Sequence, residues 1–212
     1  MSSTADQGDL TARATIRNAA LRLFAERGHD AVTVREIAGA AGVSPGLVVH
    51  HFGSKDGLRA AVDDYAARAF DALFSMDARE LAQMMATENL SSMAEVFARA
   101  FPHGSPLPAY LRRLLLTNDP TGAALFGRWH TLTRDLLDSM TEHGVARPAG
   151  DPAVRAAFLL VNDLALILLR NQIAAAIGID PLTPEGVTRW AKEVTAVYAK
   201  GAFVNPPGPE PS

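Results

Sequence analysis

The sequence predicts an all-α protein, and three observations lead to this fold class. Apolar residues recur at the three- and four-residue spacing of helices along most of the 212-residue chain. Almost no segment shows the alternation of apolar and polar residues that is typical of a strand. Glycine and proline fall mostly between the periodic runs, where they divide the chain into segments of ordinary helix length.

These segments predict two domains and a tail. Residues 10–60 contain short runs, which predict an N-terminal domain of three helices. Longer runs over 61–202 predict a larger helical domain, and the proline-rich residues 203–212 predict a disordered tail. The nine or ten expected helices cover approximately 10–27, 33–40, 45–51, 54–76, 78–87, 91–101, 106–118, 121–143, 151–178 and 183–201.

The first two helices carry clear boundary signals. Ile16, Ala20 and Phe24 lie four residues apart and give the first helix an apolar face. Gly28 follows it as a residue suited to the left-handed conformation that ends many helices. The second helix begins with Thr33-Val-Arg-Glu36, a capping box in which the threonine and glutamate side chains bond each other's backbone N–H.

The third and fourth helices also begin at polar caps. Ser44 precedes Pro45, which suits the first position of a helix because no backbone N–H is needed there. Val48 and Phe52 are expected to be the buried pair of the third helix. Ser54 is expected to cap the fourth helix, which joins the two domains.

Two short capped helices joined by a Gly-Val-Ser turn, and packed on a preceding helix, form a helix-turn-helix unit. In such a unit, the second helix enters the major groove of DNA with its N-terminal residues leading. A three-helix bundle with no role in DNA binding would have the same caps and spacing. The geometry alone leaves both interpretations open.

Residues 13–59 resemble the DNA-binding domain of the TetR family of bacterial regulators. The segment GVSPGLVVHHFGSKDGL is close to the family's recognition-helix pattern, and the match has no gap. The matching residues are Ile16, Ala20, Leu23, Phe24, Gly28, Thr33, Val34, Ile37, Ala38, Ala41, Gly42, Val43, Ser44, Gly46, His51, Phe52, Lys55 and Leu58. The resemblance implies a transcriptional regulator, usually a repressor, that binds a palindromic double-stranded DNA operator as a homodimer and is released by a small-molecule effector.

The resemblance also implies which residues contact DNA. The groove-facing positions are Arg35, Pro45, Gly46, Leu47 and His50. Arg35 is the expected base contact, because a guanidinium can bond guanine O6 and N7 together; the alternative is a solvated partner of Glu36 or Asp30. Phosphate contacts, which position the protein without reading sequence, are expected from Thr33, His51 and Lys55. His51 is equally suited to packing between helices.

One position departs from the family pattern. Family members usually carry a tyrosine two places before the histidine at position 51, and its hydroxyl contacts a phosphate; this chain has Val49 there. Because valine cannot donate a hydrogen bond, either that contact is missing or His50 replaces it. A missing contact would lower the salt dependence of binding by about 0.9 in the log–log slope.

The last two long helices are expected to form the homodimer. The run over 151–178 is too apolar for one neighbour to cover, and two such helices per subunit would build a four-helix interface around a twofold axis. The alternative is that both helices are buried inside a monomer. The residues involved are Phe158, Leu159, Val161, Leu164, Leu168 and Leu169 on the first helix, and Val187, Trp190, Val194, Val197 and Tyr198 on the second.

The effector is expected to be apolar or aromatic and to bind among the middle helices. Methionines and aromatic residues line adaptable apolar pockets, although at helical spacing they also form ordinary core. The candidate ligand-binding residues are Met85, Phe97, Tyr110, Phe126, Trp129 and His130.

Other classes of function find little support in the sequence. Composition is that of an ordinary folded protein, with 48% hydrophobic residues, a net charge of −3 and no cysteine, so a case for DNA rests on the local motif. No hydrolase, P-loop or zinc-protease motif occurs, and neither catalysis, a metal nor a cofactor is expected. A helical carrier of small molecules or lipids that does not bind DNA is the remaining alternative.

The expected location is the cytoplasm. The first residues lack the apolar core of a secretory signal, and the absence of cysteine fits a reducing compartment. Residues 156–179 are apolar enough to resemble a membrane span. However, Asp163 and Arg170 lie near its middle, where charges make insertion unfavourable. No membrane partner is therefore expected.

Overall fold

The computed structural model describes residues 4–71, 101–102 and 104–200, and every regular element in that part of the chain is a helix. The prediction of an all-α fold is confirmed. The predicted tail and the predicted helices over 78–87 and 91–101 lie outside the described residues, except for Phe101. The helices are α1 (Thr4–Arg27), α2 (Val34–Ala41), α3 (Pro45–Phe52), α4 (Lys55–Asp71), α7 (Leu107–Leu116), α8 (Pro120–Glu142), α9 (Pro152–Leu168), α10 (Arg170–Ile177) and α11 (Pro184–Lys200).

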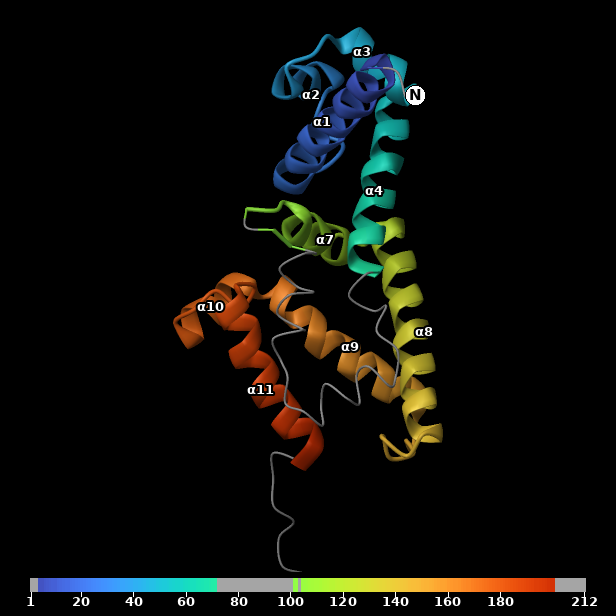
Figure 1. Cartoon of the computed structure of the whole chain (residues 1–212), viewed down its shortest axis with the longest axis vertical. Coiled ribbons are helices and arrows are strands. Elements are labelled where there is room, and N and C mark those ends of the chain that lie inside the picture. Colours follow the sequence, from blue (N-terminus) through green and yellow to red (C-terminus); the bar gives the residue numbers. More distant parts are fainter. Residues whose placement is uncertain (1–3, 72–100, 103, 201–212) are drawn as a thin grey trace, which may run out of the picture.

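The helices form an elongated molecule with different elements at its two ends (Figure 1). Helices α1, α2 and α3 gather at one end, and α4 runs from that end toward the middle. Helices α8, α9 and α11 form the other end. Helix α7 lies across the middle and packs against α1, α8 and α9. It is therefore a direct link between the two ends.

The apolar core runs without interruption through this middle region. Buried residues connect Phe24 of α1 with Val62 and Phe70 of α4, and these with Trp129 of α8 and Leu160 of α9. The rings of Phe70 and Trp129 have centroids 5.5 Å apart. Because both ends share this core, we expect them to stabilise one another.

Helix α1 begins earlier than the sequence indicates, at Thr4 instead of near residue 10. The turn around Asp9 and Leu10 is exposed, so it has no buried face that an apolar repeat would reveal. The added turn brings the Asp9 carboxylate to 3.6 Å from His51 Nε2 on α3.

The predicted single helix over 151–178 is wrong, because the chain bends by 79° between α9 and α10. Leu169 leaves the helical conformation at φ −112° and ψ 23°. Just after it, Arg170 donates from Nε to Asp180 (2.8 Å), which ties α10 back toward the start of α11. Within the described part of the chain, no single helix is long and apolar enough to cross a membrane; only this bent pair passes that test, and only taken together.

Candidate DNA-binding surface

The start of α2 is held by the predicted capping box, which the structure confirms. Thr33 Oγ1 accepts from Glu36 N (3.3 Å), and the Glu36 carboxylate accepts from both Thr33 N (2.7 Å) and Thr33 Oγ1 (2.8 Å). Arg27 donates to the same carboxylate (2.7 Å) and to the Ala31 carbonyl (2.7 Å). The bond from Arg27 and then those from Thr33 lower the pKa of Glu36 to about 2. These bonds fix α2 against the end of α1.

Helix α3 begins as the sequence predicts. Gly42 ends α2 in the left-handed conformation, at φ 69°, and Ser44 Oγ accepts from Leu47 N (3.2 Å) with Pro45 at the first helical position. Val48 is buried in the core, whereas Phe52 is only half-buried. The three-residue turn between the helices therefore sets the angle at which α3 crosses α2.

The corner between α3 and α4 is equally constrained. Ser54 Oγ accepts from Gly57 N (3.0 Å), as its predicted capping role requires. A Cβ atom at position 57 would lie 2.1 Å from the Phe52 carbonyl oxygen, so only glycine allows this approach. The direction of α3 is therefore fixed at both of its ends.

The N-terminal half of α3 faces solvent, together with one arginine of α2. Arg35, Pro45, Gly46 and His50 are exposed, and Leu47 is half-buried. Val49, at the position of the family tyrosine, is 50% exposed and offers only methyl groups. Glu36 pairs with Arg27, and within the described residues neither Glu36 nor Asp30 forms an ion pair with Arg35. The guanidinium of Arg35 is therefore available to a ligand on this surface.

Two of the predicted phosphate contacts are already engaged inside the protein. Lys55 Nζ donates to the carbonyls of His29 and Val32, both at 3.1 Å, and so closes the loop between α1 and α2. The side chain of His51 is 4% exposed and packs edge-on against His50 and Phe52. Both residues hold the unit together; packing was one of the two roles predicted for His51, whereas the internal role of Lys55 was not predicted.

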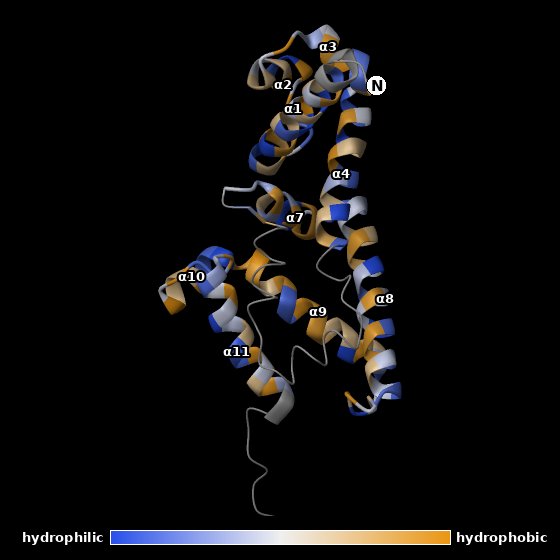
Figure 2. Ribbon diagram, in the orientation of Figure 1, coloured by the Kyte–Doolittle hydropathy of each residue, from blue (hydrophilic) through white to orange (hydrophobic). Residues whose placement is uncertain are grey.

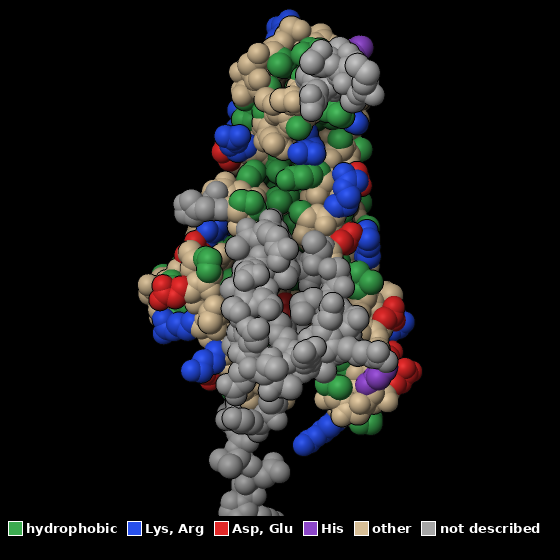
Figure 3. Space-filling view, viewed as in Figure 1, with side chains coloured by type: hydrophobic (Ala, Val, Ile, Leu, Met, Phe, Trp, Pro, Cys, Tyr) green, Lys and Arg blue, Asp and Glu red, His purple; other side chains and the backbone are tan. Residues whose placement is uncertain are grey.

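Lysine and arginine outnumber aspartate and glutamate within residues 10–60. Residues 10–60 carry seven Lys and Arg against four Asp and Glu, a net charge of +3 in a chain whose total is −3. Lys and Arg side chains are spread over the α1–α4 end in Figure 3. Arg13, which the sequence analysis did not single out, places its guanidinium 5.4 Å from the ring centroid of Phe52 at the end of α3. Its position beside α3 makes it a further candidate for a phosphate contact.

Helix α7 is bonded to the DNA-binding end at two places. Arg113 donates to the Ala25 carbonyl (3.3 Å) and the Glu26 carbonyl (3.0 Å) in the last turn of α1. Tyr110 donates from its hydroxyl to Asp63 of α4. Burial, followed by this hydrogen bond, raises the pKa of Tyr110 above its ordinary value. Movement of α7 would therefore be passed to both α1 and α4.

Helices α9 and α11 present an apolar face to solvent, part of which was predicted. Phe158 is 67% exposed, and the exposed Val154 and Val161 lie on its side of α9 at four- and three-residue spacing; Leu169, just after α9, is also exposed. Tyr198 of α11 is also exposed, and its hydroxyl accepts from Asn162 Nδ2 (2.8 Å). Figure 2 shows how apolar residues predominate along α9. Of the other predicted interface residues, Leu164 and Val187 are buried within the chain.

The predicted ligand-binding residues occupy different environments. Met85 and Phe97 lie outside the described residues. Tyr110 and Trp129 are buried, and Trp129 Nε1 donates to Asp71 (3.3 Å). Phe126 is half-buried against the core, and His130 Nε2 lies 2.9 Å from the Ala153 carbonyl. The four described residues are thus part of the packing among α4, α7, α8 and α9.

Two family models match the chain. The one described as "Bacterial regulatory proteins, tetR family" matches residues 16–62. The one described as "Tetracyclin repressor-like, C-terminal domain" matches residues 103–203. The matches thus include both the helix-turn-helix and most of the C-terminal helices.

Characterised relatives and solved structures are also similar. The chain is 40% identical over 154 residues to the HTH-type transcriptional regulatory protein RaaS of Mycobacterium tuberculosis, covering 73% of this chain and 68% of the relative. It is 34% identical over 175 residues to the HTH-type transcriptional repressor Rv3405c of the same organism, covering 80% and 79%. The fatty acid degradation regulator FadR from Bacillus halodurans has a TM-score of 0.65 at 18% identity, covering 92% of this chain and 97% of that one. That last likeness concerns the fold alone.

Proposed function

The chain belongs to the TetR family of bacterial regulatory proteins, as its sequence resemblance indicated, and from this membership we propose that it is a homodimeric repressor that a small molecule releases from a palindromic operator. It is a transcriptional regulator and not an enzyme. The observation that carries the proposal is the exposed N-terminal half of α3, held rigidly at both ends within the positively charged part of the chain.

We assign base recognition to the residues that this surface leaves exposed. Arg35 is free of the ion pairs that its neighbours form in the described part of the chain, and a bidentate contact to guanine fits its chemistry. Leu47 offers an apolar contact, for example to a thymine methyl group, and His50 a hydrogen bond. Pro45 and Gly46 have little side chain, so they let the backbone of α3 approach the groove closely.

Phosphate contacts are assigned with the internal bonds taken into account. Lys55 has three N–H donors and uses two on carbonyls, so one is left for a phosphate. The Thr33 hydroxyl donates to Glu36, and a phosphate contact from it would have to replace that bond. His51 contributes mainly by positioning α3, since its side chain is 4% exposed.

The dimer is assigned to the exposed apolar face of α9 and α11. Val154, Phe158 and Val161 recur at four- and three-residue spacing, which gives a continuous stripe along α9. Exposure of this apolar stripe to water is unfavourable. A second copy of the same two helices would bury the stripe in an interface with twofold symmetry. Two subunits then present two α3 helices to two half-sites of an operator.

The effector is proposed to be a small apolar or aromatic molecule that binds among the C-terminal helices. Support comes from α7, which contacts these helices and also bonds to α1 and α4. A ligand that prefers one position of α7 would shift the DNA-binding end by its difference in affinity, typically about 1–3 kcal/mol.

Selection of bound duplexes from a random pool tests the proposal. We expect a consensus with twofold symmetry and half-sites about one helical turn apart, bound less tightly as salt increases. The matched control is the Arg35→Ala protein, which should select a consensus with relaxed preference at one base pair in each half-site. Failure to enrich any sequence at low salt would contradict the assignment.

A further inference from the structure

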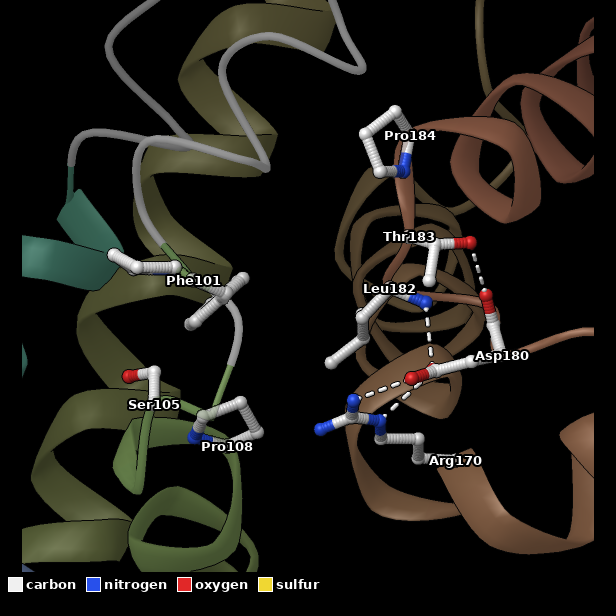
Figure 4. Close-up of a pocket in the computed structure, with 9 residues that line it drawn as sticks. Phe101, Ser105, Pro108, Arg170, Asp180, Leu182, Thr183 and Pro184 are labelled. Carbon is white, nitrogen blue, oxygen red and sulfur yellow. Dashed lines mark hydrogen bonds and ion pairs between the residues drawn. The ribbon is translucent and has the colours of Figure 1, made fainter.

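A cavity of about 230 Å³ lies between the segment that leads into α7 and the junction of α10 with α11 (Figure 4). Of the predicted ligand-binding residues that the structure describes, Tyr110, Phe126, Trp129 and His130, none lines it. Its volume is below the roughly 300–1,000 Å³ of drug-sized sites, so it suits a small molecule. The lining residues are Phe101, Pro102, Ser105, Pro108, Arg170, Asp180, Leu182, Thr183 and Pro184.

Apolar side chains form most of the wall. Phe101 and Pro108 lie on one side, and Leu182 and Pro184 face them from the segment that leads into α11 (Figure 4); Pro102 also lines the cavity. Phe101 and Leu182 are themselves largely buried, so their positions are set by the core behind them. The body of a bound molecule must therefore be apolar.

The Arg170–Asp180 pair supplies the main polar group. Arg170 donates from Nε and from Nη2 to the two Asp180 oxygens, and Asp180 also accepts from Leu182 N (3.1 Å). The third nitrogen of the guanidinium, Nη1, forms no hydrogen bond within the described part of the chain. Figure 4 shows it pointing across the cavity toward Ser105 and Pro108. The ion pair with Asp180 thus holds the two N–H groups of Arg170 Nη1 in a fixed direction.

Ser105 lines the opposite wall, and Figure 4 draws its hydroxyl oxygen on the side away from Arg170. Ser105 Oγ accepts from Leu107 N (3.3 Å), so its hydrogen can be donated. Thr183 has no further hydrogen to donate, because its hydroxyl donates to the Asp180 carbonyl (2.8 Å); it also accepts from Gly186 N (3.1 Å). Among the described lining residues, Arg170 Nη1 is therefore the donor that points into the cavity.

Charge in the lining selects between ligand classes. Among the described residues that line this cavity, Arg170 and Asp180 are the charged ones, and their charges cancel. A carboxylate would meet Asp180 as well as Arg170, and a cation would lack a free partner. An uncharged acceptor avoids both costs. We propose that this cavity binds a small, uncharged and largely apolar molecule that presents a carbonyl oxygen to Arg170 and packs against the wall formed by Ser105 and Pro108.

A consequence for DNA binding follows from where the cavity lies, and this part rests on the proposed function. Ser105 and Pro108 stand at the start of α7, the helix whose Tyr110 and Arg113 bond to α4 and α1. A molecule held between Arg170 and Ser105 fixes the start of α7 relative to α10 and α11. Occupancy of the cavity thereby changes the position of the DNA-binding end.

Three compounds of one shape test the ligand class. Acetophenone carries the carbonyl, cumene replaces it with a branched carbon, and benzoate adds a charge. With methyl-labelled protein, NMR titration should shift the Leu182 methyl signals, with acetophenone binding about tenfold more tightly than cumene and more tightly than benzoate. Unchanged Leu182 signals, or equal affinity for the three compounds, would overturn the proposal.

Variants locate the site. Ser105→Phe and, separately, Pro102→Trp fill the cavity and should abolish the acetophenone shifts, whereas Thr131→Phe on the exposed side of α8 should retain them. Binding that survives in a folded cavity-filling variant would refute the assignment.

Operator binding is measured separately by fluorescence anisotropy. Acetophenone is expected to dissociate the wild-type protein from the operator duplex but not the Ser105→Phe protein. If the protein binds no duplex even without acetophenone, the proposed function is contradicted, whereas the NMR evidence for the cavity is unaffected.

Discussion

The two ends of this molecule share local helix caps and differ in their long-range contacts. Helices α2, α3 and α4 begin at the caps Thr33, Ser44 and Ser54, and α8, α9 and α11 begin in the same way at Asp119, Asp151 and Thr183. At the α8–α11 end, the bend after α9 involves Arg170 and Asp180, ten residues apart. Arg113 of α7 reaches a carbonyl of α1, 88 positions back in the chain. The comparison teaches that a DNA-binding surface positioned by residues close in sequence can be recognised from sequence. An effector region whose shape depends on contacts between residues far apart in the chain cannot be recognised in this way.

The largest expected effect tests whether the two ends are energetically separate. Trp129→Ala should destabilise the protein by about 3–5 kcal/mol, because this large side chain is fully buried in the shared core. Urea unfolding followed by circular dichroism should show one transition, including α1–α3. His130→Ala, one position along and half-buried, should cost far less. A second transition in which α1–α3 stay folded would contradict the continuity of the core.

The next largest effect separates DNA recognition from stability. Arg35→Ala should lower operator affinity by about 1–3 kcal/mol, since one bidentate base contact per subunit is lost. The free energy of unfolding should not change, because Arg35 has no ion pair in the described structure. Arg22→Ala, an exposed change on α1 outside the α2–α3 unit, is the control. Equal losses in the two variants would show that Arg35 acts only through general charge.

A smaller effect probes the link between the ends. Arg113→Met should cost about 1 kcal/mol of stability, because the carbonyls of Ala25 and Glu26 lose a charged donor. It should also reduce the effect of an effector on DNA affinity. Arg112→Met changes the exposed neighbour on the same helix and should do neither. An unaltered effector response in the Arg113 variant would place the coupling elsewhere.

At the DNA-binding end, a carboxylate should stabilise the fold as pH rises. The pKa of Glu36 is lowered from 4.5 to about 2, first by the hydrogen bond from Arg27. Its contribution is therefore fully present above pH 4.5 and is lost as pH falls through about 2. Glu36→Gln should remove this component in acid unfolding curves. The effect is small because the group is exposed, and identical pH profiles for the two proteins would argue against the capping network.

At the other end, a carboxyl should have the opposite pH dependence. Asp163 is exposed on α9 but has protein close around it, and desolvation by this protein raises its pKa from 3.8 to about 6. The folded state then loses stability as pH rises from about 4 to 6. Asp163→Asn should lie progressively above the wild type in stability over that range and match it below. A constant difference at all pH values would exclude this cause.

Local residues made most of the DNA-binding end predictable. The capping box at Thr33, the cap at Ser44 and the ends of α2 and α3 follow from residue types and spacing. Lys55 was different, because its carbonyl partners at His29 and Val32 are more than 20 positions away. An exposed lysine and a lysine that closes a loop look alike in sequence, so its internal role became visible only in three dimensions.

Tertiary contacts explain what sequence reasoning missed in the C-terminal helices. No glycine or proline lies at the bend around Leu169, so the sequence does not indicate it. The first turns of α1 have no repeat of apolar residues from which a helix could be predicted. Phe158 and Trp129 are both large apolar residues on helices, yet one faces solvent and the other the core. Periodicity can place such residues on a face but cannot say what covers that face.

Sedimentation velocity of the protein with a duplex obtained by selection tests the central claim most directly. The account predicts two subunits on each duplex that carries both half-sites, with affinity that falls steeply when one half-site is scrambled. A single subunit bound to each duplex, or equal affinity for intact and scrambled sites, would contradict the proposal that α3 enters the groove twice per assembly.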